Sequence, residues 1–94
     1  MKLLICICTY NRNLSLLRCL KSINNLYVVL NIKIKIIVVD NSENYISHKL
    51  VKKLKKSFKY KIIHLHEKRR GIVYSRNRFL SKVKKINPQF ICFF

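Results

Sequence analysis

Residues 5–13 read ICICTYNRN, an apolar run that becomes polar within two residues. Successive side chains of a strand point to opposite faces of the sheet, and this run is apolar at both sets of positions. A strand that is apolar on both faces is typical of a parallel sheet covered by helices on both sides. The stretch therefore predicts a buried parallel strand over residues 3–8, with polar residues where that strand ends.

The same design occurs twice more, as an apolar run, a polar break and then apolar residues at helical spacing. Further strands are predicted over residues 34–39, 60–65 and 90–94. The residues expected to face inward from the helices are Leu16, Leu17, Leu20 and Ile23, then Ile46, Leu50, Val51, Leu54 and Phe58, then Ile72, Phe79, Leu80 and Val83. Asn13 is the expected N-cap of the first helix. These units predict an α/β fold: an open, mostly parallel sheet of about four strands, with three helices distributed over both faces.

The composition limits the size of the domain but names no partner. The chain has 94 residues, enough for one small domain at most. It has 21 Lys and Arg against three acidic residues, and the net charge of +18 would attract nucleic acid, anionic lipid and phosphate-bearing ligands alike. Lys, Ile and Asn are all abundant and all have codons rich in A and T, so a biased genome would explain the basicity equally well.

Cysteine usage and hydropathy predict a cytoplasmic protein. Cys6 and Cys8 would lie on the same face of one strand, too constrained to form a bridge, so the cysteines are expected to be reduced. No repeated Cys or His spacing of the kind that binds zinc is present. The first ten residues do not form a signal peptide, and Lys33 and Lys35 interrupt the longest later apolar stretch, so no membrane span is expected.

Polar and charged residues follow each of the first three predicted strands. They are Thr9, Tyr10, Asn11 and Arg12, then Asp40, Asn41 and Ser42, then Glu67, Lys68, Arg69 and Arg70. The carboxyl ends of parallel strands meet at one edge of the sheet, where open α/β sheets bind ligands. An aromatic ring, a carboxylate and several arginines suit the base, ribose and diphosphate of a nucleotide. The first loop lacks glycine, which excludes a P-loop and a dinucleotide fingerprint.

Four stretches of the chain carry a resemblance to a known family. They are ICICTYNRNLSLLRCLKSI, IKIIVVDNSEN, EKRRGIVYSRNRFL and PQFICFF. In this order and at these intervals they resemble the N-terminal blocks of family 2 glycosyltransferases, inverting enzymes of GT-A fold that use nucleotide sugars. The resemblance implies that residues 1–94 are the Rossmann-like, nucleotide-binding portion of a glycosyltransferase domain whose acceptor-binding C-terminal portion is absent.

The resemblance also implies roles for particular residues. Thr9 and Tyr10 would lie against the nucleotide base, Asp40 would bond the base or ribose, and Arg76 would lie near the base or diphosphate. The expected role of Asn11 and Arg12 is to shape the first loop. The expected ligand is a nucleotide sugar such as a UDP-sugar, used by the family to build polysaccharides.

The resemblance further implies a divalent metal, Mg²⁺ or Mn²⁺, on the sugar diphosphate. In the family its ligands belong to an Asp-x-Asp motif that would come directly after residue 94, and the catalytic base comes later still. The expectation is therefore a fragment that binds a nucleotide sugar without transferring the sugar by itself.

Each of these residues also has a purely structural interpretation. Asp40 after a buried strand can be a helix cap or a loop-closing acceptor. Tyr10 can be an aromatic side chain that packs at the sheet edge. A structural Arg76 would need an anionic partner such as Asp40 or Glu67.

The alternative function is a small basic α/β module that binds nucleic acid through the cations around the third loop. They are Lys68, Arg69, Arg70, Arg76 and Arg78. Nucleic acid is disfavoured because no recognised motif is present and the aromatic residues occupy core positions. A lysine stripe on the second helix, formed by Lys49, Lys52, Lys53 and Lys56, is either a solvated face or a contact for anionic lipid. The second interpretation would place the protein peripherally on the inner face of the membrane.

Overall fold

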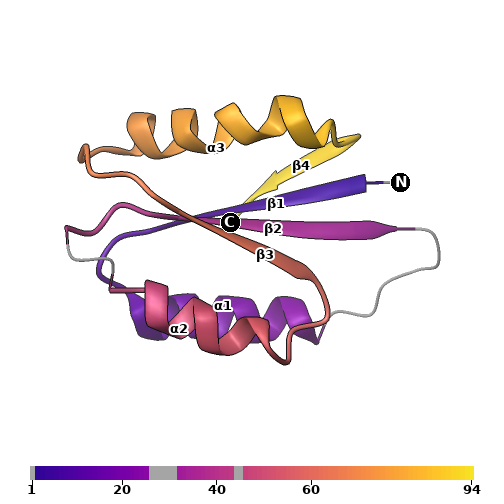
Figure 1. Ribbon diagram of the computed structural model, residues 1–94, viewed down its shortest axis with the longest axis horizontal. Helices are drawn as coiled ribbons and strands as arrows, with labels where there is room; N and C mark the ends of the chain where they lie inside the picture. The colour runs from indigo at the N-terminus through magenta and orange to yellow at the C-terminus, as the bar shows by residue number, and fades with distance from the viewer. Residues whose placement is uncertain (1, 26–31, 44–45) are drawn as a thin grey trace.

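The computed structural model describes residues 2–25, 32–43 and 46–94. Its elements alternate strictly between strand and helix along the chain (Figure 1). They are β1 (Lys2–Thr9), α1 (Asn13–Asn24), β2 (Lys33–Asp40), α2 (His48–Lys55), β3 (Lys61–His66), α3 (Ile72–Ile86) and β4 (Phe90–Phe93). The element types and their order agree with the sequence pattern.

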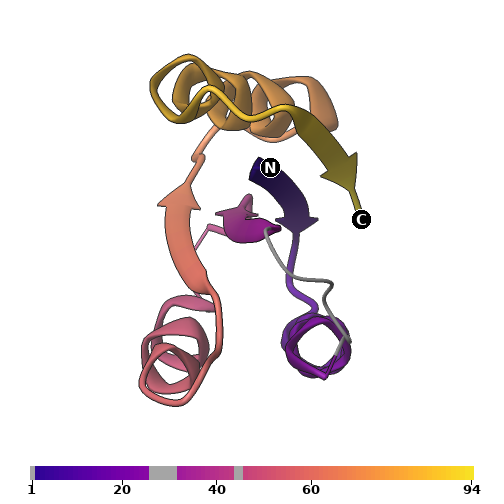
Figure 2. The same ribbon diagram turned by 90° about the vertical axis from the view of Figure 1, so that its right-hand side faces the viewer.

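The four strands form one parallel sheet in the order β3-β2-β1-β4. Helices α1 and α2 lie side by side on one face, and α3 covers the other (Figures 1 and 2). This confirms the predicted α/β fold with helices on both faces. Strand β1 pairs with both β2 and β4, so the strand order reverses beside β1, and ligands of open α/β sheets bind at the carboxyl ends of strands at such a point.

The alternation of side chains along β1 and β2 divides the core into two layers. Ile5 and Ile36 belong to the layer that packs against α1 and α2, whereas Leu4 and Ile37 belong to the layer that packs against α3. Phe79 of α3 is fully buried in the second layer. Both faces of the central strands are thus covered, which explains why the sequence is apolar at consecutive positions there.

The structure corrects one predicted helix cap and shifts the strand ends by at most one residue. Asn13 is the first residue of α1 rather than its N-cap; Arg12 occupies the cap position, and no side chain caps this end. The Asn13 side chain instead donates a hydrogen bond of 2.8 Å to the carbonyl of Ile46. A long-range partner has replaced the local bond that the sequence pattern favoured.

Three of the apolar residues expected to face inward are exposed instead. Ile46 precedes α2, and Ile72 begins α3 at the end of the sheet. Leu80 lies about 100° around the helix from Phe79, so the two cannot both face the sheet squarely. No helix in the described ranges is long and apolar enough to cross a membrane.

Candidate functional site

A pocket of about 280 Å³ lies at the carboxyl end of β1, beside the first turn of α3. Its lining residues are Cys8, Thr9, Tyr10, Arg12, Asn41, Ile72 and Ser75. A second hollow of about 190 Å³ shares Cys8, Thr9 and Arg12 and extends toward α1 and Phe94. Both hollows adjoin the point where the strand order reverses. Three of the predicted residues, Thr9, Tyr10 and Arg12, therefore line one pocket at the predicted edge.

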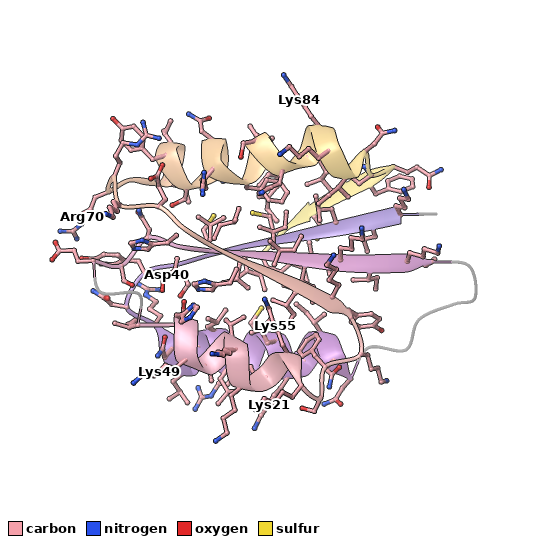
Figure 3. The ribbon with its side chains drawn as sticks, in the orientation of Figure 1. Lys21, Asp40, Lys49, Lys55, Arg70 and Lys84 are labelled. Carbon is pink, nitrogen blue, oxygen red and sulfur yellow. The ribbon has the colours of Figure 1, made fainter. Side chains whose placement is uncertain are left out.

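Asp40 belongs to the same end of the sheet but is completely buried (Figure 3). One carboxylate oxygen accepts hydrogen bonds from the backbone N–H and the hydroxyl of Ser42, at 2.8 and 2.5 Å. The other accepts from the same two groups of Ser47, at 3.1 and 2.5 Å. Ser47 directly precedes α2, so the carboxylate closes the loop that leads into this helix.

Burial acts to raise the pKa of Asp40, but the hydrogen bonds from Ser42 and Ser47 outweigh it, and the pKa lies below its usual value. The carboxylate is therefore ionised at neutral pH with its lone pairs occupied. Asp40 is thus a loop-closing acceptor, which is one of its two structural interpretations from the sequence. Any contribution of Asp40 to a ligand would be indirect, through the shape of the loop.

Asn41 joins the loop after β2 to the loop after β3. Its side-chain amide donates to the carbonyls of Glu67 and Arg69, each at 2.7 Å, and its oxygen accepts from the N–H of Gly71 at 3.0 Å. Gly71 has φ +131°, a conformation that side chains rarely adopt, so the only glycine of the chain stands where this junction needs it. Asn41 thus fixes one wall of the pocket against α3.

Tyr10 and Arg70 bridge the first loop to the third. The Arg70 guanidinium donates to the Tyr10 hydroxyl and lies 4.6 Å from the centre of its ring. Next to it, Arg69 pairs with Glu67 at 2.8 Å and lies 4.6 Å from the Tyr74 ring. The ring that the resemblance assigns to a base is therefore in contact with an arginine.

Arg76 lies at the same end of the sheet as Asp40 but on the face that α3 covers. Its guanidinium is 5.4 Å from the centre of the Phe93 ring in β4. Among the described residues it forms an ion pair with neither Asp40 nor Glu67, the two partners considered for a structural role. The structure does not bring Arg76 into contact with Asp40, and Arg76 flanks the pocket rather than lining it.

Asn11 is exposed in the first loop with φ +50°, a left-handed conformation that Asn tolerates better than most residues. It allows the chain to turn from β1 into α1. It does not line the pocket, and its expected part in nucleotide binding, through the shape of the first loop, stays a prediction.

Cys8 is a pocket residue that sequence reasoning assigned only to the core. A hydrogen bond from Cys6 lowers the pKa of the Cys8 thiol to about 7, burial opposes this, and the charge of Arg76 assists it. The same pairing raises the pKa of Cys6. The spacing of the two cysteines on one strand face was the available signal, but only the tertiary structure places the second thiol at a hollow.

Two of the three acidic residues of the chain are not placed as ligands for a divalent metal. Asp40 is saturated by serines, and Glu67 pairs with Arg69. Of the residues that the structure describes, no three His, Cys, Asp or Glu side chains form a group that could hold a metal ion. A metal on a sugar diphosphate would need carboxylates other than these.

Comparison with known families identifies the family of the chain. Residues 4–94 match the family described as glycosyl transferase family 2. No curated protein and no solved structure shows a significant match to the chain. Since the match spans nearly every residue, the chain belongs to glycosyl transferase family 2.

Proposed function

We propose that the chain binds a nucleotide sugar in the pocket at the end of β1, as the nucleotide-binding portion of a glycosyltransferase. The observation that carries the proposal is the joint position of Thr9, Tyr10 and Arg12 at one pocket, beside the reversal of strand order, in a member of this family. Family membership supports glycosyl transfer as the reaction class. The pocket supports binding of the nucleotide sugar as the step of that reaction which these residues would perform.

In this proposal the Tyr10 ring stacks on the nucleotide base, and Arg70 leaves the ring to meet the diphosphate. The exchange is favourable because a guanidinium gives up a cation–π contact and gains charge-assisted hydrogen bonds to phosphate oxygens. Arg12 at the pocket wall and Arg76 at its flank add positive charge on the same side. Thr9 supplies a buried hydroxyl between the two hollows.

We further propose that these residues bind the donor without transferring its sugar. Departure of a nucleoside diphosphate builds negative charge, and the acceptor hydroxyl must lose a proton to a base. Asp40 and Glu67 are both engaged in internal contacts, as described above. Neither is available as a base in this arrangement.

The experiment is isothermal titration of the chain with UDP, GDP, dTDP and inorganic diphosphate. At least one nucleoside diphosphate should bind more tightly than diphosphate alone. Tyr10→Ala should weaken that binding by about tenfold or more, the usual effect of losing one base-stacking ring. Arg12→Gln should weaken binding of the nucleotide and of diphosphate together.

Arg18→Gln is the matched control, since Arg18 is an exposed arginine of α1 outside both hollows. A second readout is alkylation of Cys8, which bound nucleotide should slow. The proposal fails if no nucleoside diphosphate binds better than diphosphate, or if Arg18→Gln weakens binding as much as Arg12→Gln. Transfer of a sugar by the chain alone would refute the absence of turnover.

A further inference from the structure

A third hollow, of about 210 Å³, lies at the amino ends of β1 and β2, where α3 comes to its end. In Figure 1 this is the right-hand end of the sheet, opposite the end at which the loops after β1, β2 and β3 gather. The residues that line it are Lys2, Leu3, Lys33, Lys35, Ile86 and Pro88. None of them lines the hollows at the carboxyl end of β1, so an inference from this hollow is independent of the proposed nucleotide binding.

Strand alternation places the three lysines of this hollow on one face of the sheet. Lys2 alternates with Leu4, which belongs to the core layer that packs against α3. Lys33 and Lys35 alternate with Ile37 of the same layer. Lys35 is half-buried. The three lysines therefore share the face that α3 covers, at the place where this helix ends.

The register of the sheet sets these lysines against like charges. Lys2 pairs with Lys33, and Lys35 pairs with Lys61 at the start of β3. Neighbouring strands lie about 4.8 Å apart, and like charges directly opposite each other in a sheet are unfavourable. The backbone of Lys2 is also held in place, because its N–H donates to the Gln89 side chain at 2.8 Å and its carbonyl accepts from the Gln89 N–H at 3.0 Å. The strands therefore cannot shift to separate the charges without breaking these bonds.

The negative charges of the chain are too far away to compensate. All three acidic residues lie at the other end of the sheet, at or after the carboxyl ends of β2 and β3; they are Asp40, Glu43 and Glu67. Lys35 and Asp40 are five residues apart in one strand, about 16 Å, which exceeds the Debye length of about 8 Å at physiological salt. The carboxyl end of α3 contributes only about half a negative charge. An anion from outside the chain would therefore relieve the repulsion at this hollow.

The wall opposite the lysines is apolar. Ile86 is the last residue of α3, and Pro88 lies in the connection to β4. Asn87 between them has φ +51°, and its N–H donates to the carbonyl of Val83 at 2.8 Å, which ends the helix and turns the chain. The hollow has room for several water molecules, more than one carboxylate group would displace. Methylene groups beside that carboxylate would cover the apolar wall and leave water.

We propose that this hollow binds an amphipathic organic anion of low molecular weight. Its carboxylate or phosphate group would lie on Lys2, Lys33 and Lys35, and a short alkyl part would lie against Ile86 and Pro88. Each lysine donates to the anionic oxygens as a point charge, and the alkyl part gains from the burial of apolar surface. Binding should therefore require both the negative charge and the apolar chain of the ligand.

The test uses octanoate as the probe, at concentrations too low for micelles, with calorimetry and the backbone amide signals of NMR spectra. Binding should saturate and shift the signals of Lys2, Lys33 and Gln89, but not those of Tyr10 and Arg12 in the other pocket. From butanoate to octanoate, affinity should rise about threefold for each methylene group that becomes buried. Octylammonium has the same chain and the opposite charge, and it should bind at least about tenfold more weakly.

Two double variants test the lysines. Lys33→Gln with Lys35→Gln should weaken octanoate binding about tenfold, because two charged donors are lost. Lys49→Gln with Lys84→Gln is the matched control, since both lysines are exposed and point away from the sheet in Figure 3, and it should change affinity less than about twofold. Without ligand, Lys33→Gln with Lys35→Gln should keep or raise the urea midpoint, because like charges have been removed.

Equal losses of affinity in the two double variants would overturn the proposal, because they would show a general effect of positive charge. Affinity that does not depend on chain length, or equal binding of octylammonium, would overturn it as well. A urea midpoint lowered by Lys33→Gln with Lys35→Gln would show a structural role for these lysines and count against a ligand site. Vesicles of phosphatidylcholine with phosphatidylserine form a separate arm. Vesicle binding without octanoate binding would replace this site by an extended lipid-facing surface. No arm contains a nucleotide, so failure here leaves the proposed function unaffected.

Discussion

At the residue scale, Asp40 shows how a carboxylate in a binding region can serve the loop around it. It accepts four hydrogen bonds from Ser42 and Ser47 and has no exposed surface. Hydrogen bonds to a charged group contribute more than neutral ones, and a buried carboxylate without them would be costly. The chain retains the charge because the serines stabilise it.

Replacing this carboxylate with an amide should destabilise the protein. Asp40→Asn puts an NH₂ group opposite donors, so we expect the free energy of unfolding at pH 7 to fall by about 2–4 kcal/mol. Urea denaturation followed by circular dichroism measures it. Glu43→Gln, an exposed acid in the same loop, is the control and should change the stability by less than about 0.5 kcal/mol.

The same pair of variants gives a pH test with a defined sign. Because the folded-state pKa of Asp40 is depressed, its contribution is fully present above the unfolded pKa of about 3.9 and is lost as the pH falls through the lower folded value. The difference in stability between the unmodified chain and Asp40→Asn should therefore shrink below about pH 4. A difference that stays constant down to pH 2 would mean that the carboxylate does not act through its charge.

At the scale of elements, α3 covers its face of the sheet mainly through one large side chain. Phe79 is completely buried and contacts Phe93 of β4, with ring centroids 5.3 Å apart. Its neighbour Leu80 is about half exposed. The packing of this layer therefore depends unequally on two adjacent apolar residues.

Phe79→Ala should lower the free energy of unfolding by about 3–5 kcal/mol, since it leaves a cavity between α3 and the sheet. Leu80→Ala should cost less than about 1 kcal/mol. Urea denaturation compares the two. Phe79→Leu removes less volume, so its loss in free energy of unfolding should lie between those of the two alanine variants. It replaces Phe79→Ala in the comparison if that variant is too unstable to measure. Equal effects at positions 79 and 80 would contradict the described orientation of α3.

Strand β4 is the more exposed edge of the sheet. Phe90, Ile91 and Phe93 are each between 41% and 56% exposed, and the strand carries no charge. An apolar edge with unpaired backbone groups recruits other chains. Strand β3, at the opposite edge, carries Lys61 and two histidines.

We therefore expect the chain to self-associate through β4. Light scattering at increasing protein concentration should show growth in mass that Ile91→Lys reduces. Lys59→Gln, outside the sheet, serves as a control for altered surface composition. If Ile91→Lys leaves the association unchanged, β4 is not its origin.

At the scale of the whole molecule, the net charge of +18 opposes compactness. Only three acidic residues are present, and two of them are used internally, so the surface is almost uniformly positive. Repulsion among exposed lysines extends over about 8–10 Å at moderate ionic strength. Added salt should relieve it.

We expect the free energy of unfolding to rise by an amount of order 1 kcal/mol between 0.02 and 0.5 M NaCl, in a buffer free of phosphate. Urea midpoints at several salt concentrations measure the trend. Lys49→Glu with Lys53→Glu lowers the net charge by two at each position. This double variant should therefore make stability depend less on the salt concentration. Stability that falls with salt would show that local ion pairs outweigh the general repulsion.

The sequence by itself determined the α/β class, the number of strands and helices and the edge at which polar residues gather. Hydrophobic periodicity is local and reports which residues must be buried, so both apolar faces of residues 3–8 could be recognised without coordinates. It also predicted that Thr9, Tyr10 and Arg12 would share this edge, where they line one pocket.

Only the tertiary structure decided which way the side chains at that edge are directed. Asp40 and Asn41 are adjacent in the sequence, yet one is enclosed by serines and the other spans two loops and lines the pocket. The partners of Asn41 lie 26, 28 and 30 residues away in the chain, and no local pattern specifies such pairs. The same reason applies to His48 and His64, whose rings meet because α2 packs on the β3 edge.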